Sequence, residues 1–190
     1  MIYKEPDINL SDIDFREEYV GLNDEFSLKV LLIRTNKRTR CKCYDPLNHD
    51  GDPNCKTCGG TGKLNIIEMT PTIHENFNTS SLIKMTELGL SVSNTILFYF
   101  DYKVIPRFRD KILIVGYDNL GIPIDIKKDC TIASVEEIRG EKGRVEAYMV
   151  YAKYSPENII RDQKRLNKIP PEIKKEIMKG RRFTWPQDTQ

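Results

Sequence analysis

Four cysteines lie within 18 residues of this 190-residue chain, and their spacing restricts how that segment can fold. Cys41 and Cys43 form one close pair, and Cys55 and Cys58 form a second. The residues between the pairs are rich in Asp, Asn, Pro and Gly, so this loop cannot bury an apolar core of its own. Two thiolate pairs at the ends of such a loop can complete the tetrahedral shell of a zinc ion, which would then supply the folding free energy.

The cysteine pattern predicts a structural zinc site rather than a catalytic one, because four cysteines close the shell and a catalytic zinc keeps an open position. The alternative is two disulfides, which the lack of a secretory signal disfavours. His49 is a reserve ligand, and Cys130 lies in a strand-like segment as an expected buried, small hydrophobic residue. The predicted zinc ligands are Cys41, Cys43, Cys55 and Cys58.

Residues 55–62 read Cys-Lys-Thr-Cys-Gly-Gly-Thr-Gly and match the pattern C-x-x-C-x-G-x-G. The glycines after the second cysteine let backbone amides turn towards the thiolates. This octet resembles one cysteine repeat of the DnaJ-type chaperone zinc domain. That family carries four such repeats and a His-Pro-Asp signature, whereas this chain has one repeat, a shorter C-x-C partner and no such signature. The resemblance therefore implies a zinc knuckle and not a chaperone.

Short segments rich in Ile, Val, Tyr and Phe, separated by Gly, Asp and Asn, predict a mainly β fold. Their spacing favours a small antiparallel β-barrel or sandwich over βαβ units. Residues 139–144 predict a hairpin turn. The expected strands cover residues 28–33, 64–67, 95–102, 111–117, 131–138 and 145–154.

The net charge is only +2, but the charges are unevenly distributed. Residues 1–26 carry two basic and eight acidic groups and predict an acidic N-terminal arm, with one short helix at most. Residues 27–154 form the predicted barrel domain, with the zinc loop at 37–64. Residues 155–190 carry nine basic and five acidic groups and predict a helical, basic C-terminal arm. Near its end, Trp185 is either an interface anchor or part of a chain end that folds back onto its own domain.

Composition and motifs argue against several classes of function. No apolar run approaches the roughly 18 residues of a membrane span, and the first residues do not form a signal peptide. The sequence lacks the nucleophile, phosphate-binding, dinucleotide-binding and zinc-protease motifs. We therefore expect a non-enzymatic protein with no small-molecule substrate and no membrane partner, made in the cytoplasm.

The apolar strands of residues 95–154, the Arg139-Gly140 turn and the helical arm that follows resemble the small β-barrels of tailed-bacteriophage neck and tail proteins. This resemblance implies a virion structural protein that joins head to tail, or forms a neck or tail ring, through contacts with copies of itself and with neighbouring virion proteins. Contact with packaged DNA stays open. The alternative is a zinc-dependent module that binds nucleic acid or protein, suggested by basic residues between Arg34 and Lys42 beside the first cysteines.

Overall fold

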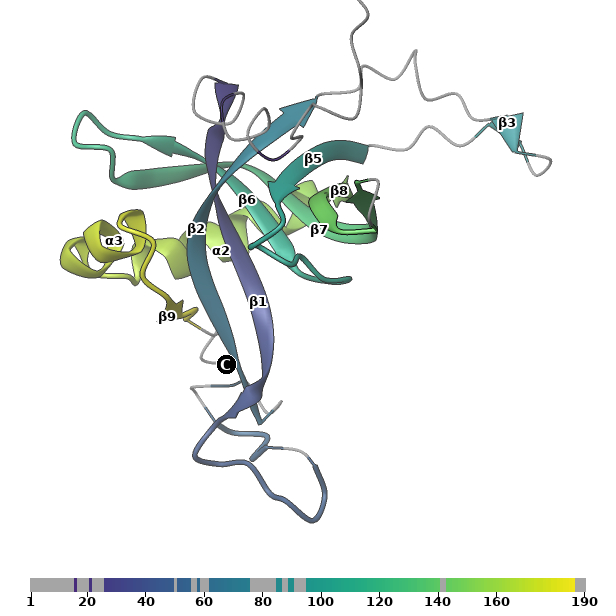
Figure 1. Ribbon diagram of the computed structural model, residues 1–190. Coiled ribbons are helices and arrows are strands. Elements are labelled where there is room, and N and C mark those ends of the chain that lie inside the picture. Colours follow the sequence, from purple (N-terminus) through teal and green to yellow (C-terminus); the bar gives the residue numbers. More distant parts are fainter. Residues whose placement is uncertain are drawn as a thin grey trace, which may run out of the picture.

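Six antiparallel strands form a closed β-barrel, which decides between the barrel and the sandwich that the sequence left open (Figure 1). The computed structural model describes residues 16, 21, 26–49, 51–55, 58, 62–75, 85–86, 89–90, 95–140 and 143–186. The barrel strands are β1 (Leu28–Arg40), β2 (Lys63–Glu75), β5 (Thr95–Asp101), β6 (Lys111–Tyr117), β7 (Pro123–Arg139) and β8 (Val145–Tyr154).

Around the barrel the strands follow the order β1-β6-β7-β8-β5-β2, and the pairing of β1 with β2 closes the circle. Strands β5 and β6 are not neighbours, so residues 102–110 cross an end of the barrel to connect them. A short strand, β9 (Phe183–Thr184), pairs with β2 at Ile66 and Ile67. Strands β3 (Met85–Thr86) and β4 (Gly89–Leu90) form a separate two-stranded sheet.

Three strands are longer than the sequence predicts. Strand β1 continues to Arg40, β2 continues to Glu75, and β7 begins at Pro123. These extensions are polar or interrupted by proline, and a proline such as Pro71 argues against a strand. Long-range pairing sets their length instead, because Leu28 lies opposite Thr72 at one end of the β1–β2 ladder and Arg40 lies opposite Lys63 at the other.

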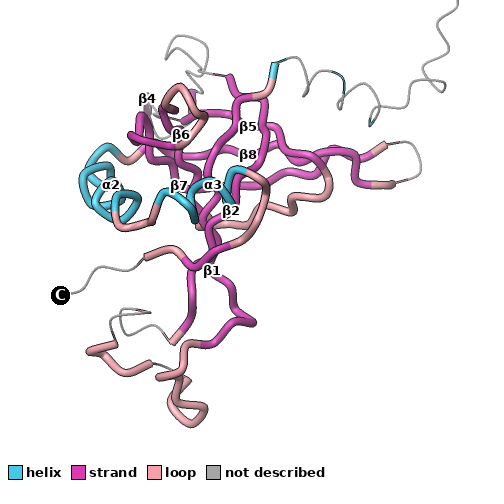
Figure 2. The backbone as a smooth tube through the Cα atoms, turned by 90° about the vertical axis from the view of Figure 1, so that its left-hand side faces the viewer, coloured by secondary structure: helices cyan, strands magenta, loops and turns pink. Residues whose placement is uncertain are grey.

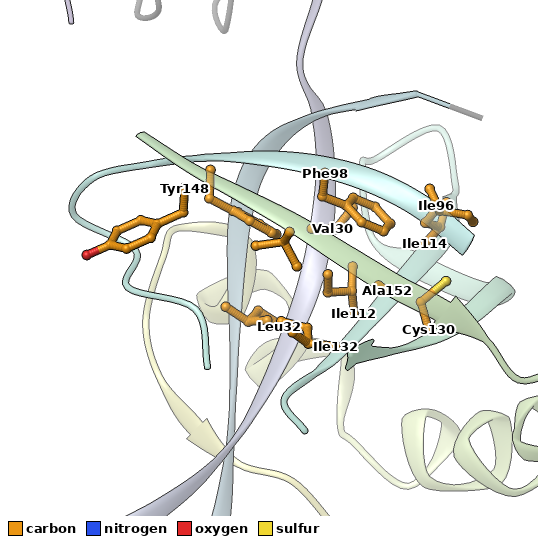
Figure 3. Packing of buried hydrophobic residues seen from close by; sticks show 12 residues of the cluster. Val30, Leu32, Ile96, Phe98, Ile112, Ile114, Cys130, Ile132, Tyr148 and Ala152 are labelled. Atoms are coloured by element: carbon orange, nitrogen blue, oxygen red, sulfur yellow. The ribbon is translucent and has the colours of Figure 1, made fainter. Parts of the chain in front are cut away.

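One apolar cluster fills the barrel interior. Figure 3 shows its side chains, which come from alternating positions of β1, β5, β6, β7 and β8. The rings of Phe98 and Phe100 stack with their centres 6.2 Å apart. Cys130 is fully buried in this cluster, which confirms its predicted role as a small hydrophobic residue, and burial raises the pKa of its thiol to about 12.

A second apolar cluster lies on the outside of the barrel wall, under the C-terminal segment. This segment comprises a 3-10 turn, η2 (Pro156–Asn158), and the helices α2 (Ile159–Asn167) and α3 (Pro171–Met178), and it ends with β9. Strands β1 and β6 thus bury both faces, so four successive residues are buried in each. The cluster consists of Leu31, Ile33, Ile67, Leu113, Val115, Ile126, Leu166, Ile169, Ile177 and Trp185.

The C-terminal segment is helical, as predicted, but it does not project from the barrel. Trp185 is only 1% exposed, and its backbone N–H donates to the carbonyl of Asn65 at 2.8 Å. The interpretation of Trp185 as an interface anchor is therefore wrong, and the alternative of a chain end folded back onto its own domain is correct. No helix in the described residues is long and apolar enough to cross a membrane. The acidic segment 1–26 lies outside the described residues except at positions 16, 21 and 26.

Buried charges fix α2 to the barrel. Lys111 Nζ lies 2.6 Å from Asp162 Oδ2 on α2 and 3.2 Å from Asp129 Oδ2 on β7, and both carboxyl groups are fully buried. Burial and then the hydrogen bond to Asp162 raise the pKa of Asp129 to about 7. Burial alone would also raise the pKa of Asp162, but hydrogen bonds from Asp129 and Lys111 outweigh it and hold that pKa below its usual value. The pKa values of the two buried carboxyl groups thus shift in opposite directions, upward for Asp129 and downward for Asp162.

The second cluster makes the C-terminal segment part of the folded unit. We expect Trp185→Ala to lower the free energy of unfolding by about 3–5 kcal/mol, because it removes the largest fully buried side chain. Urea unfolding followed by far-UV and near-UV circular dichroism should show one shared transition. The control, Leu120→Ala, changes a side chain that is 77% exposed and should stay within about 0.5 kcal/mol. Early loss of the helices with an unchanged barrel transition would contradict the shared unit.

The raised pKa of Asp129 predicts a pH dependence. The folded chain binds the proton of Asp129 more tightly than the unfolded chain, so this contribution to stability is complete below about pH 4 and is lost as the pH rises through about 7. In Asp129→Asn this position cannot titrate. Relative to that variant, the wild type should lose stability over this range with a slope approaching about 1.4 kcal/mol per pH unit. Urea unfolding at several pH values measures the difference, and a constant difference would be inconsistent with the raised pKa of Asp129.

Candidate metal centre

The four clustered cysteines lie at the far end of the β1–β2 hairpin. Strand β1 pairs with β6 only from Leu31 to Ile33, and β2 pairs with β9 only at Ile66 and Ile67. Beyond these residues the two strands pair only with each other in the described structure. Figures 1 and 2 show from two directions that this part of the hairpin extends away from the barrel.

The four predicted ligands are brought together. Their Sγ atoms all lie within 4.8 Å of one another. The Sγ atoms of Cys41 and Cys55 are 3.6 Å apart, and those of Cys43 and Cys58 are 3.3 Å apart. Four sulfurs bound tetrahedrally to zinc at about 2.3 Å would lie about 3.8 Å from one another. The residues present therefore fit a four-sulfur metal site that clamps the two strands together.

Turns on both sides of the hairpin direct the thiols towards one point. The N–H of Cys41 donates to the carbonyl of Gly62 at 2.9 Å, and the N–H of Tyr44 donates to the carbonyl of Cys41 at 3.0 Å. Before the second pair, the Asp52 carbonyl accepts from the N–H of Cys55 at 2.9 Å. The Asp52 side chain accepts from the N–H of Asn54 at 2.9 Å, which is the local turn that Asp favours.

Two glycines allow the backbone to approach the sulfurs. The N–H of Gly62 donates to Cys58 Sγ at 3.3 Å, as expected for a glycine after the second cysteine, and Gly62 has a φ of 62°. Sequence reasoning missed Gly51. A Cβ there would lie 2.4 Å from the Gly62 nitrogen and 3.1 Å from Cys43 Sγ. The only sequence signal for this close approach is the Asp50-Gly51 dipeptide, which is typical of a tight turn.

None of the five cysteines of the chain forms a disulfide. Desolvation and then hydrogen bonding to the thiols of Cys55 and Cys58 raise the pKa of Cys43 to about 12. A divalent cation at the centre would supply the positive charge that lets these thiols ionise.

Three side chains near the cluster do not bind at its centre, namely those of His49, Arg40 and Lys42. His49, the reserve ligand, lies outside the cysteine cluster, and its Nδ1 is 3.1 Å from the hydroxyl of Tyr44. The guanidinium of Arg40 lies 4.4 Å from the centre of the Tyr44 ring, and the side chain of Lys42 is exposed. These cations offset part of the negative charge that a four-thiolate zinc site would carry.

The arrangement offers a closed set of four equivalent ligands. It leaves no coordination position for water or substrate, so a metal bound here would have a structural role. Neither a protein-family model nor a curated protein sequence matches this chain.

Removal of one ligand should separate the metal site from the barrel. We expect Cys58→Ser to reduce bound zinc from one ion per chain to well below stoichiometry, because a hydroxyl is a poor zinc ligand. Residues 41–62 should become sensitive to protease, whereas the free energy of unfolding of the barrel should change by less than about 1 kcal/mol, since neither apolar cluster includes this loop. Metal analysis and limited proteolysis measure both effects.

The fifth cysteine provides the matched control. Cys130→Ala changes a cysteine in the barrel interior and should retain the full zinc content. Equal zinc content in Cys58→Ser and Cys130→Ala would eliminate the metal centre.

Proposed function

We propose that this chain is a non-enzymatic structural protein of a tailed-phage virion, in which zinc stiffens the β1–β2 hairpin for contact with a neighbouring subunit of a neck or tail ring. The observation that carries this proposal is the position of the four-cysteine site. It lies at the end of a hairpin that extends beyond the barrel, and past Asn65 the strands of this hairpin pair only with each other among the described residues. A metal at that position adds nothing to the barrel core and makes the hairpin end rigid.

Zinc is the metal that this ligand set favours. Four thiolates in a tetrahedral arrangement favour zinc or iron among the biological metals. Zinc suits the structural role proposed here because it undergoes no redox reactions. When bound, the ion would supply folding free energy to the loop and no chemical step.

The distribution of buried titratable groups supports a non-enzymatic role. Lys111, Asp129 and Asp162 are bonded to one another where α2 meets the barrel, and both carboxyl groups are fully buried. These groups hold secondary-structure elements together.

The assignment to a phage virion rests on the sequence resemblance of residues 95–154 and the following arm. A barrel with a projecting hairpin suits a ring, because a hairpin that contacts a different surface of the next copy generates a heterologous contact that can close. The partners would be copies of this chain and neighbouring virion proteins. The protein would be made in the host cytoplasm and act in the virion.

A zinc-dependent module that binds nucleic acid is the second candidate. It is favoured by the Arg40–Tyr44 stack and the exposed Lys42 beside the metal site, since cations and aromatic rings together bind nucleic acids. This function requires a monomer whose binding weakens steeply with salt.

Native mass spectrometry, with and without a chelator, distinguishes the two candidates. For the ring protein we expect one zinc ion per chain and closed oligomers, with smaller species after zinc removal because the hairpin loses its rigid end. A zinc-bound monomer that binds DNA with a steep salt dependence would favour the second candidate. Iron in place of zinc would overturn the metal assignment, and a chain without metal would overturn both candidates.

A further inference from the structure

The loop between β5 and β6, residues 102–110, presents cationic and apolar side chains together. Phe108 is 62% exposed and Ile105 is 52% exposed. The side chains of Lys103, Arg107 and Arg109 are also exposed. The guanidinium of Arg109 lies 5.2 Å from the centre of the Phe108 ring. Arginine and aromatic residues are enriched where proteins bind their partners, and an exposed apolar group among cations fits such a surface.

The backbone of this loop is held in an unfavourable conformation. Ile105 has a φ of 48° and Arg109 has a φ of 69°, and residues with a Cβ rarely adopt such values, β-branched residues least of all. Backbone hydrogen bonds fix the loop at both ends. The N–H of Val104 donates to the backbone carbonyl of Asp101 at 2.9 Å, and the N–H of Arg109 donates to the backbone carbonyl of Ile132 at 3.0 Å. Strain of this kind persists only where the surrounding structure enforces it, and it is concentrated at functional sites.

The chemistry of the loop specifies an acidic partner that also carries apolar side chains. Nucleic acid would satisfy the cations, but its phosphates give the aliphatic side chain of Ile105 no contact. Residues 1–15 of this chain have the matching composition. They carry four acidic residues and one basic residue, with apolar residues interspersed. The segment is therefore complementary to the loop in both charge and hydrophobicity.

Arg16 marks where this segment leaves its own barrel. Its guanidinium lies 3.8 Å from the centre of the Tyr102 ring, and its Nε lies 2.9 Å from Glu146 Oε2 on β8. Asp14 is two residues and Asp12 is four residues from Arg16, so an extended chain carries them at most about 7 and 14 Å away.

The other end of the loop, at Arg109, lies farther from Arg16 than the extended-chain distances of Asp12 and Asp14. The backbone N–H of Arg109 donates a hydrogen bond to the carbonyl of Ile132 on β7, and Ile132 lies opposite Ala152 on β8. Ala152 is six residues along β8 from Glu146, which Arg16 contacts. At strand spacing this separation is roughly 15–20 Å. In an extended chain the Cα atoms of Asp12 and Asp14 fall short of this separation, but Asp7 and Glu5, nine and eleven residues from Arg16, can span it. Charge and hydrophobic complementarity thus allow a contact within one chain or between copies, and the proposed ring favours the contact between copies.

We propose that loop 102–110 is the receptor for the acidic N-terminal segment, residues 1–15, of a second copy of this chain. Each subunit then donates one segment and offers one loop. This inference rests on the proposed ring, because a donor and a receptor at different places on one subunit form the heterologous contact that a ring requires.

A charge-swap experiment on the full-length chain tests the contact. The loop variant is Arg107→Glu with Arg109→Glu, and the segment variant is Asp12→Lys with Asp14→Lys. Each alone should weaken self-association at least tenfold in sedimentation at low salt, and an equimolar mixture should recover it because opposite charges then meet between chains. The matched control, Lys164→Glu with Lys168→Glu, changes two exposed residues on and just after α2 by the same net charge and should associate as the wild type does.

The variants also distinguish a contact between subunits from one within a subunit. Recovery only when all four substitutions are in one chain would place the contact within a subunit and overturn the proposal. If both variants associate as strongly as the wild type, the loop is not the receptor, and the proposed ring is unaffected. Phe108→Ala changes no charge and should weaken association as well, which guards against a loop variant that fails to fold.

A peptide titration decides the role of the loop if the wild type proves monomeric, a result that overturns the ring and the exchange between copies. The probe is a fluorescent synthetic peptide of residues 1–15, added to the full-length segment variant. Binding that the loop substitutions weaken at least tenfold supports the loop as the receptor of this segment, and equal binding with and without them overturns it. If a DNA oligonucleotide displaces the fluorescent peptide at a lower concentration than the unlabelled peptide does, the loop binds nucleic acid. That result overturns residues 1–15 as its partner.

Discussion

The antiparallel pairing of β1 with β2 is the interaction on which the rest of the described structure depends. At one end, Leu28 lies opposite Thr72 and the ladder closes the barrel. In the middle, the same register directs alternate β1 side chains into the barrel and into the second apolar cluster. At the far end it brings the two cysteine pairs together. A slip of one residue would exchange the two faces of β1 and separate the thiols, so a single register sets all three features.

An ion-paired group at the base of the hairpin connects this ladder to the parts that surround it. Glu68 on β2 is almost fully buried, and its carboxylate lies 2.6 Å from Arg34 on β1 and 2.5 Å from Arg182 of the C-terminal segment. Arg34 also donates to the carbonyl of Val104 in the loop between β5 and β6. Buried ion pairs add little net stability after desolvation, so the main effect of this group is to fix the positions of hairpin, tail and loop.

Sequence alone was sufficient for the presence of the six barrel strands, the two helices and the four clustered cysteines, because each depends on local spacing. It did not give the full lengths of β1, β2 and β7. It was insufficient where distant segments meet. The position of Trp185 depends on docking against β1 and β6, and local periodicity carries no information on that docking. A signal was present in the uninterrupted apolar runs from Val30 to Ile33 and from Ile112 to Val115, since a strand exposed on one face alternates. The strained loop at Ile105 has no sequence signature.

The hairpin end and the loop between β5 and β6 are made rigid in different ways, and the loop packs Val104 against the first apolar cluster. Among the described residues, the hairpin end contributes none to either apolar cluster, so its order depends on the turns and on a metal at the four sulfurs. The loop between β5 and β6 is held by backbone hydrogen bonds against its own strain. A surface that is ordered before it meets a partner loses little conformational entropy on binding, so even a small contact can be specific. Both parts therefore suit assembly from many weak contacts better than they suit chemistry.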